Sequence, residues 1–71
     1  MSTNRELLGT ATDADGDEIE VYHDKDEGKI VIESQDGFGA TTMWYTEPQM
    51  AYLVELLIHA HDTLKEEMQH G

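Results

Sequence analysis

At residues 43–50 the sequence reads Met-Trp-Tyr-Thr-Glu-Pro-Gln-Met, and here the spacing of apolar side chains changes from every second residue to the helical period of about 3.6. Thr46 is suited to cap a helix, and Gln49, three residues later, completes a capping box. Pro48 lies in the first turn, where its missing N–H group costs nothing. The stretch therefore indicates the end of a strand and the start of a helix.

After this stretch, apolar residues recur at the i, i+3, i+4, i+7 spacing of one face of a helix. We call this set the helix stripe: Met50, Leu53, Val54, Leu57, Ile58, His61, Leu64 and Met68. It predicts a helix from about residue 47 to residue 68, within a helical segment 46–69. At about 100° per residue, a second face of the same helix carries Tyr52, Leu56, His59 and Thr63.

Before this stretch, four segments have the composition of strands: residues 7–12, 18–23, 29–34 and 38–45. Short turn sequences rich in Asp and Gly separate them, which favours antiparallel pairing of neighbours. We therefore predict one α+β domain over residues 1–71. It has a disordered tail at 1–5, a three- to four-stranded antiparallel meander at 6–45, and one amphipathic helix packed on a face of that sheet. Whether the first strand, with Gly9 at its middle, joins the sheet stays open.

The alternation in the predicted strands places Ile19, Val21, Ile30 and Ile32 on one face, which the helix stripe is expected to cover. The uncovered face would hold Tyr22 and Val31, with either Met43 and Tyr45 or Phe38 and Trp44. Apolar residues on the second face of both layers favour an interface over scattered surface side chains, because so small a chain has no third layer. The predicted interface residues are Tyr52, Leu56, His59, Thr63, Tyr22 and Trp44.

Composition excludes several classes of function. The 71 residues include 16 Asp or Glu, 4 Lys or Arg and no Cys, for a net charge of −12. Without Cys there is no thiol catalysis, Cys-ligated zinc or disulfide. The few basic residues form no patch, which disfavours direct binding to nucleic acid or to an anionic membrane. With no targeting signal and no long apolar run, we expect a soluble cytoplasmic protein.

Carboxylates are dense in the middle of the chain and define a predicted acidic face: Asp13, Asp15, Asp17, Glu18, Glu20, Asp24, Asp26 and Glu27. Such a face either stays solvated, as a high-salt source would also favour, or meets a basic protein. Asp13, Asp15 and Asp17 have the spacing of calcium ligands, but Glu18 stands where an EF-hand needs Gly. An acidic turn is favoured over a weak divalent-cation site.

Nothing in the sequence assembles an enzyme site, and no cofactor is expected. His61 lies within the helix stripe, which favours a core or interface histidine over a pH-sensitive or catalytic one. His59 and His61 point to different sides of a helix and cannot share a metal ion. Gly37-Phe38-Gly39 is followed by no helix start, so it indicates a hairpin and not a phosphate loop.

The segment Met43-Trp44-Tyr45-Thr46-Glu47-Pro48-Gln49, running into a helix with Leu and Ala, resembles the ends of many small acidic proteins of actinobacteria and their phages. The likeness covers roughly residues 40–65. It implies a phage-like or accessory origin, and no functional residue is carried over from it.

The preferred hypothesis is a small acidic, non-catalytic protein-interaction module that forms a homodimer. The alternative is a mimic of nucleic acid that inhibits a basic host protein, such as a nuclease, a restriction or CRISPR protein, or a transcription factor. A further alternative is a weak divalent-cation binder. Salt separates the first two, because binding by a mimic weakens as ionic strength rises, whereas an apolar interface persists or tightens.

Overall fold

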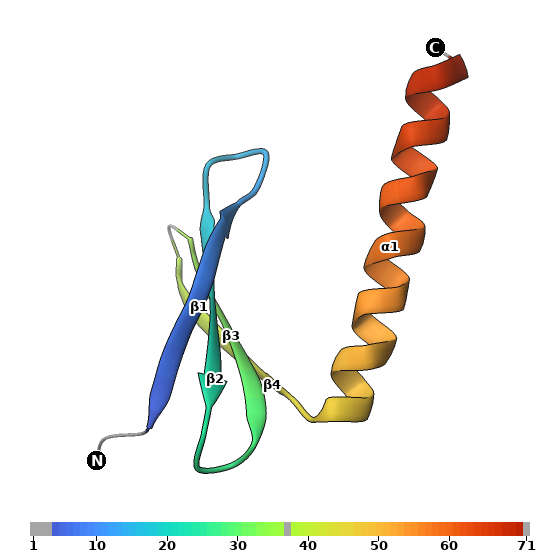
Figure 1. Ribbon diagram of the computed structural model, residues 1–71. Helices are drawn as coiled ribbons and strands as arrows, with labels where there is room; N and C mark the ends of the chain where they lie inside the picture. Colours follow the sequence, from blue (N-terminus) through green and yellow to red (C-terminus); the bar gives the residue numbers. More distant parts are fainter. Residues whose placement is uncertain (1–3, 37, 71) are drawn as a thin grey trace.

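The computed structural model describes residues 4–36 and 38–70 and contains one sheet and one helix (Figure 1). The elements are β1 (Arg5–Thr12), β2 (Glu18–Asp24), β3 (Lys29–Asp36), β4 (Gly39–Tyr45) and α1 (Glu47–His70). The strands lie in the order β1-β2-β3-β4, and each pairs antiparallel with its neighbour. The predicted ββββα fold, with the helix packed against the sheet, is confirmed.

The first strand does join the sheet. β1 begins at Arg5, so that residue belongs to the sheet and not to the predicted tail, while residues 1–3 of that tail lie outside the described residues. The register of β1 against β2 shifts between Leu7 and Gly9. Leu8 is thus the extra residue of a β-bulge. A glycine in the middle of a strand, here Gly9, commonly marks such a bulge.

Aspartates hold the first two turns closed. Oδ1 of Asp13 accepts hydrogen bonds from the backbone N–H groups of Asp15 and Asp17, both at 2.9 Å. Oδ1 of Asp24 accepts in the same way from Asp26 at 3.1 Å and from Glu27 at 3.2 Å. Carboxylates that accept from nearby backbone amides stabilise a turn locally, so the Asp-rich turns follow from the sequence itself.

The register determines which side chains share a face. Tyr22 pairs with Val31 and Val31 with Trp44, so these three form one row, which we call the aromatic face. Met43 pairs with Ile32 and Tyr45 with Ile30. Met43 and Tyr45 therefore extend the opposite face, which we call the isoleucine face: Ile19, Val21, Ile30 and Ile32. The sequence had left the two arrangements of β4 open.

The most buried side chain lies on the aromatic face. Val31 is 0% exposed and is the one fully buried apolar side chain among the described residues. Arg5 of β1 reaches over the ring of Tyr22, with 5.6 Å between guanidinium carbon and ring centre, and pairs with Glu33 of β3 at 2.8 Å. This bridge across β2, with Tyr22 and Trp44 on either side in register, covers Val31.

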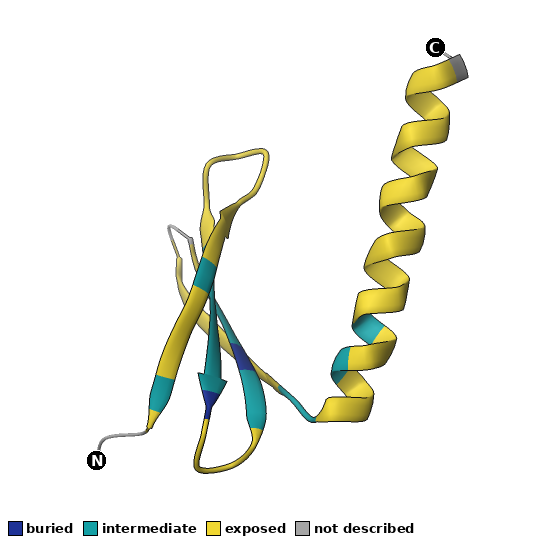
Figure 2. Ribbon diagram, in the orientation of Figure 1, coloured by how far each residue is buried: buried dark blue, intermediate teal, exposed yellow. Residues whose placement is uncertain are grey.

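Helix α1 packs on the sheet through its first turns. Met50 and Leu53 of the helix stripe are half-buried, and α1 lies against β3 and β4 but, within the described residues, against neither β1 nor β2. From Val54 onward the stripe is exposed, reaching 80% at Met68 (Figure 2). The prediction that the whole stripe covers the isoleucine face is therefore wrong beyond Leu53. The rest of the helix runs beside the sheet and stays exposed (Figure 1).

Candidate functional site

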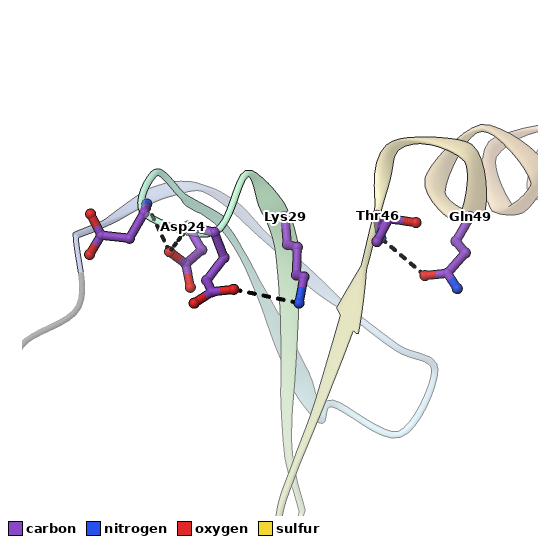
Figure 3. Close-up of polar contacts among 6 residues, drawn as sticks. Asp24, Lys29, Thr46 and Gln49 are labelled. Atoms are coloured by element: carbon purple, nitrogen blue, oxygen red, sulfur yellow. Dashed lines mark hydrogen bonds and ion pairs between the residues drawn. The ribbon is translucent and has the colours of Figure 1, made fainter.

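A single residue, Thr46, connects β4 to α1. Its backbone N–H donates a hydrogen bond to Oε1 of Gln49 at 3.1 Å (Figure 3). Its carbonyl oxygen accepts one from the N–H of Met50 at 2.8 Å. The bond from Gln49 back to the N-cap residue is one half of the predicted capping box. These bonds fix the direction in which the helix leaves the sheet.

An open groove of about 720 Å³ lies where β4 meets the first turns of α1. Its lining residues are largely apolar or aromatic: Met43, Trp44, Tyr45, Pro48, Gln49, Tyr52, Leu53 and Leu56. Tyr52 and Leu56 are 70% and 50% exposed. Tyr45 donates a hydrogen bond from its hydroxyl to the sulfur of Met43 at 3.6 Å, which joins two groove side chains of β4. A concave apolar surface with few polar groups is typical of a binding site.

Three of the six predicted interface residues, Trp44, Tyr52 and Leu56, come together in this groove. His59 and Thr63 continue the same face of α1 and are exposed, and the Thr63 hydroxyl donates to the backbone carbonyl oxygen of His59 at 3.0 Å. Tyr22 does not join them, because it lies on β2, which has no contact with α1 in the described residues, and its side chain contacts Arg5 and Glu20.

The remaining groove residues were missed by reasoning from the sequence, although a signal was present. The sequence leaves Met43 and Tyr45 between two faces and assigns Leu53 to the helix stripe. It explains Pro48 and Gln49 as helix-start residues alone. Because one residue joins strand to helix, the last side chains of the strand and the first turn of the helix must lie close together. That proximity in the chain was enough to predict the groove.

Tyr22 has an unusual polar environment on the aromatic face. Its hydroxyl donates a hydrogen bond to Oε1 of Glu20 at 2.9 Å. This bond to a carboxylate raises the pKa of Tyr22 above its usual value of 10.0, and desolvation and the charges of Glu20 and Glu33 act in the same direction, against Arg5. The neutral phenol is therefore favoured in the folded chain, and this contribution to stability is lost as the pH rises through the raised pKa.

Replacing Glu20 with Gln is expected to lower the pKa of Tyr22 towards the usual tyrosine value, because a neutral acceptor no longer opposes ionisation. The change is measured by following tyrosinate absorbance against pH, with a Tyr22→Phe variant to assign the signal. Glu6→Gln is the control, since Glu6 pairs with Lys25 and is not among the groups that shift Tyr22. An unchanged Tyr22 titration in Glu20→Gln would contradict this assignment.

The predicted acidic face is divided between the two ends of β2. Asp13, Asp15, Asp17 and Glu18 are exposed around the β1–β2 turn, whereas Asp26 and Glu27 are exposed at the β2–β3 turn. The seven residues of β2 separate these ends by about 23 Å. Glu20 is half-buried and bonded to Tyr22, and Asp24 is only 5% exposed because its carboxylate caps a turn. The eight carboxylates therefore do not form one continuous surface.

The carboxylates also do not gather into a metal site. Across residues 4–36 and 38–70, no group of three or more His, Asp or Glu side chains is placed to hold a metal ion. Oδ1 of Asp13 instead accepts two backbone N–H groups of its own turn. A smaller hollow of about 280 Å³ lies among Arg5, Asp24, Glu27, Lys29 and Trp44, where Lys29 and Glu27 approach to 3.7 Å.

Comparison with known proteins found no match among protein-family models, curated proteins or solved structures. In the described part of the chain, no helix is both long enough and apolar enough to cross a membrane. The groove and the exposed face of α1 are therefore the candidate functional surfaces of the described residues.

Proposed function

We propose that this chain is a non-catalytic protein-interaction module that forms a homodimer through α1 and the groove beside it. The observation that carries the proposal is the projecting helix, whose apolar side chains Val54, Leu57, Ile58 and Leu64 are 45–59% exposed. In a soluble monomer, apolar residues at helical spacing lie against a core. A contiguous exposed stripe of this kind is typical of an interaction surface.

The dimensions of the chain support the proposal. Its radius of gyration is 14.7 Å, whereas a compact domain of this length has about 11 Å. Its accessible surface is 5770 Å², against about 4,450 Å² for a compact monomer of the same mass. The excess of about 1,300 Å² is larger than the share of about 800 Å² that each partner contributes to a standard interface.

The distribution of charge also supports it. The chain carries a net charge of −12, which opposes self-association at low salt. The residues that line the groove are all uncharged, and the helix stripe contains no Asp, Glu, Lys or Arg. Acidic side chains at a dimer contact would repel one another, so their absence from these two surfaces fits a meeting of two copies.

Sedimentation equilibrium tests the proposal. Wild type is expected to sediment at twice the 8.0 kDa chain mass. The fraction of dimer should rise as salt is added, because salt screens the repulsion between the two negatively charged chains. Leu56→Glu, which places a charge in the groove, is expected to sediment as a monomer. Gln69→Glu adds the same charge at an exposed position outside the stripe and the groove, and should remain dimeric. A dimeric Leu56→Glu variant would exclude this face.

A further inference from the structure

Two apolar surfaces of the same chain are incompletely covered. One is the isoleucine face, whose residues Ile19, Val21, Ile30 and Ile32 are half-buried: α1 lies against β3, but β2 has no contact with α1 in the described residues. The other is the part of the helix stripe from Val54 to Met68, which is exposed along its length. A sheet face and a helix stripe are the surfaces that cover each other in two-layer α+β domains.

The short connection between β4 and α1 limits how far the helix can turn back over its own sheet. Thr46 alone links the elements. Its hydrogen bond with Gln49 (Figure 3) and its bond with Met50 hold the exit direction of the helix. Figure 1 shows α1 running beside the sheet and away from it after its first turns. A short connection that keeps an element from its own domain favours exchange of that element between copies.

We propose that the dimer forms by helix exchange: the helix stripe of each copy covers the isoleucine face of the other. This rests on the proposed self-association and specifies its geometry. The groove beside β4 is then where the partner helix enters, since its Met43 and Tyr45 lie on the isoleucine face. Helix Leu and Ile side chains would pack on Ile19, Val21, Ile30 and Ile32.

The lengths of the two surfaces agree. From Val54 to Met68 the stripe extends for about 21 Å at 1.5 Å per residue. Strands β2 and β3 have seven and eight residues, which span about 23–27 Å. The exposed part of the stripe thus runs the length of the sheet that it would cover.

A second copy is the occupant that the areas favour. In a symmetric dimer each copy gives one helix and receives one, so the helix stripe and the isoleucine face of both chains are used. Obligate homodimers bury about 1,000 Å² or more per chain, and the excess exposed surface of about 1,300 Å² per chain meets that requirement. A partner that bound the helix alone would leave the isoleucine face uncovered.

Lengthening the connection tests the exchange. A flexible insert of six Gly and Ser residues between Tyr45 and Thr46 adds about 13 Å of reach and leaves the Thr46–Gln49 bond intact. The helix can then return to its own sheet, so we expect the mass by sedimentation to halve while circular dichroism retains the wild-type helix content. The same insert between Asp15 and Gly16, in the β1–β2 turn, should leave the dimer unchanged.

The outcomes separate this proposal from the broader one. If wild type and both insertion variants are dimers, exchange is wrong and self-association stands. If wild type is a monomer, or pairs solely with a different protein, both proposals fail.

A pair of point variants gives an independent decision, including the case where the lengthened chain does not fold. Ile32→Asp and Leu57→Asp should each be monomeric, and an equimolar mixture should regain a dimer, because one intact helix meets one intact sheet. An Ile32→Asp variant that stays dimeric by itself would indicate helix-to-helix pairing and overturn exchange.

Discussion

Replacing Leu57 and Leu64 together with Asp is expected to dissociate the proposed dimer and to unfold most of α1. Each leucine that loses its burial costs at least about 1.5 kcal/mol, and a dimer contains four of them. The resulting loss of about 6 kcal/mol weakens association about ten-thousand-fold. Helical residues without a packed face are marginal in water, so the helix beyond Leu53 should melt in the monomer.

Sedimentation equilibrium and far-ultraviolet circular dichroism on the same samples measure both effects. The control is Ala51→Asp with Gln69→Asp, which introduces the same two charges at exposed positions of α1 outside the stripe. It should keep the dimer mass and nearly all of the helix signal. A Leu57→Asp, Leu64→Asp variant that remains dimeric would show that the stripe is not part of the interface.

Replacing Val31 with Ala is expected to lower the free energy of unfolding by about 2 kcal/mol. The substitution removes two methylene-sized groups worth about 0.8 kcal/mol each, and the cavity left behind adds to the loss. A domain of this size has a free energy of unfolding of roughly 3–5 kcal/mol, so the substitution would remove about half of it. The cause is local to the row of Tyr22, Val31 and Trp44.

Urea unfolding followed by the fluorescence of Trp44, the one tryptophan of the chain, measures the change at a fixed chain concentration. Thr42→Ala is the matched control, because it replaces another β-branched strand residue with Ala at an exposed position. It should shift the free energy of unfolding by at most about 0.5 kcal/mol. Equal losses in the two variants would show that Val31 is not part of a core.

The local features of the fold could be predicted from the sequence because each depends on residues close together in the chain. The Asp- and Gly-rich turns separate the strands, and Thr46 and Gln49 mark the start of the helix at the bond observed between them. Likewise, Trp44, Tyr52 and Leu56 share a groove because one residue joins their elements.

The features that depend on distant residues could not be predicted. Val31 is buried because of its partners in the neighbouring strands and because Arg5 pairs with Glu33, 28 positions away. The alternation of apolar residues along the strand alone predicts that Val31 lies on the sheet face that the helix does not cover. Asp24 was assigned to the acidic surface because the sequence does not reveal that its carboxylate turns inward. Periodicity defines the helix stripe but does not tell what that stripe lies against.

The order of strands in the sheet also implies an order of events in time. Because every strand pairs with the next one along the chain, the sheet can form within a single molecule and at a rate that dilution does not change. Covering the isoleucine face by exchange needs an encounter between two molecules, so its rate rises with their number. In the proposed dimer, a newly made chain would thus form its sheet first. Its helix would pack on a partner only after enough copies have accumulated for two chains to meet.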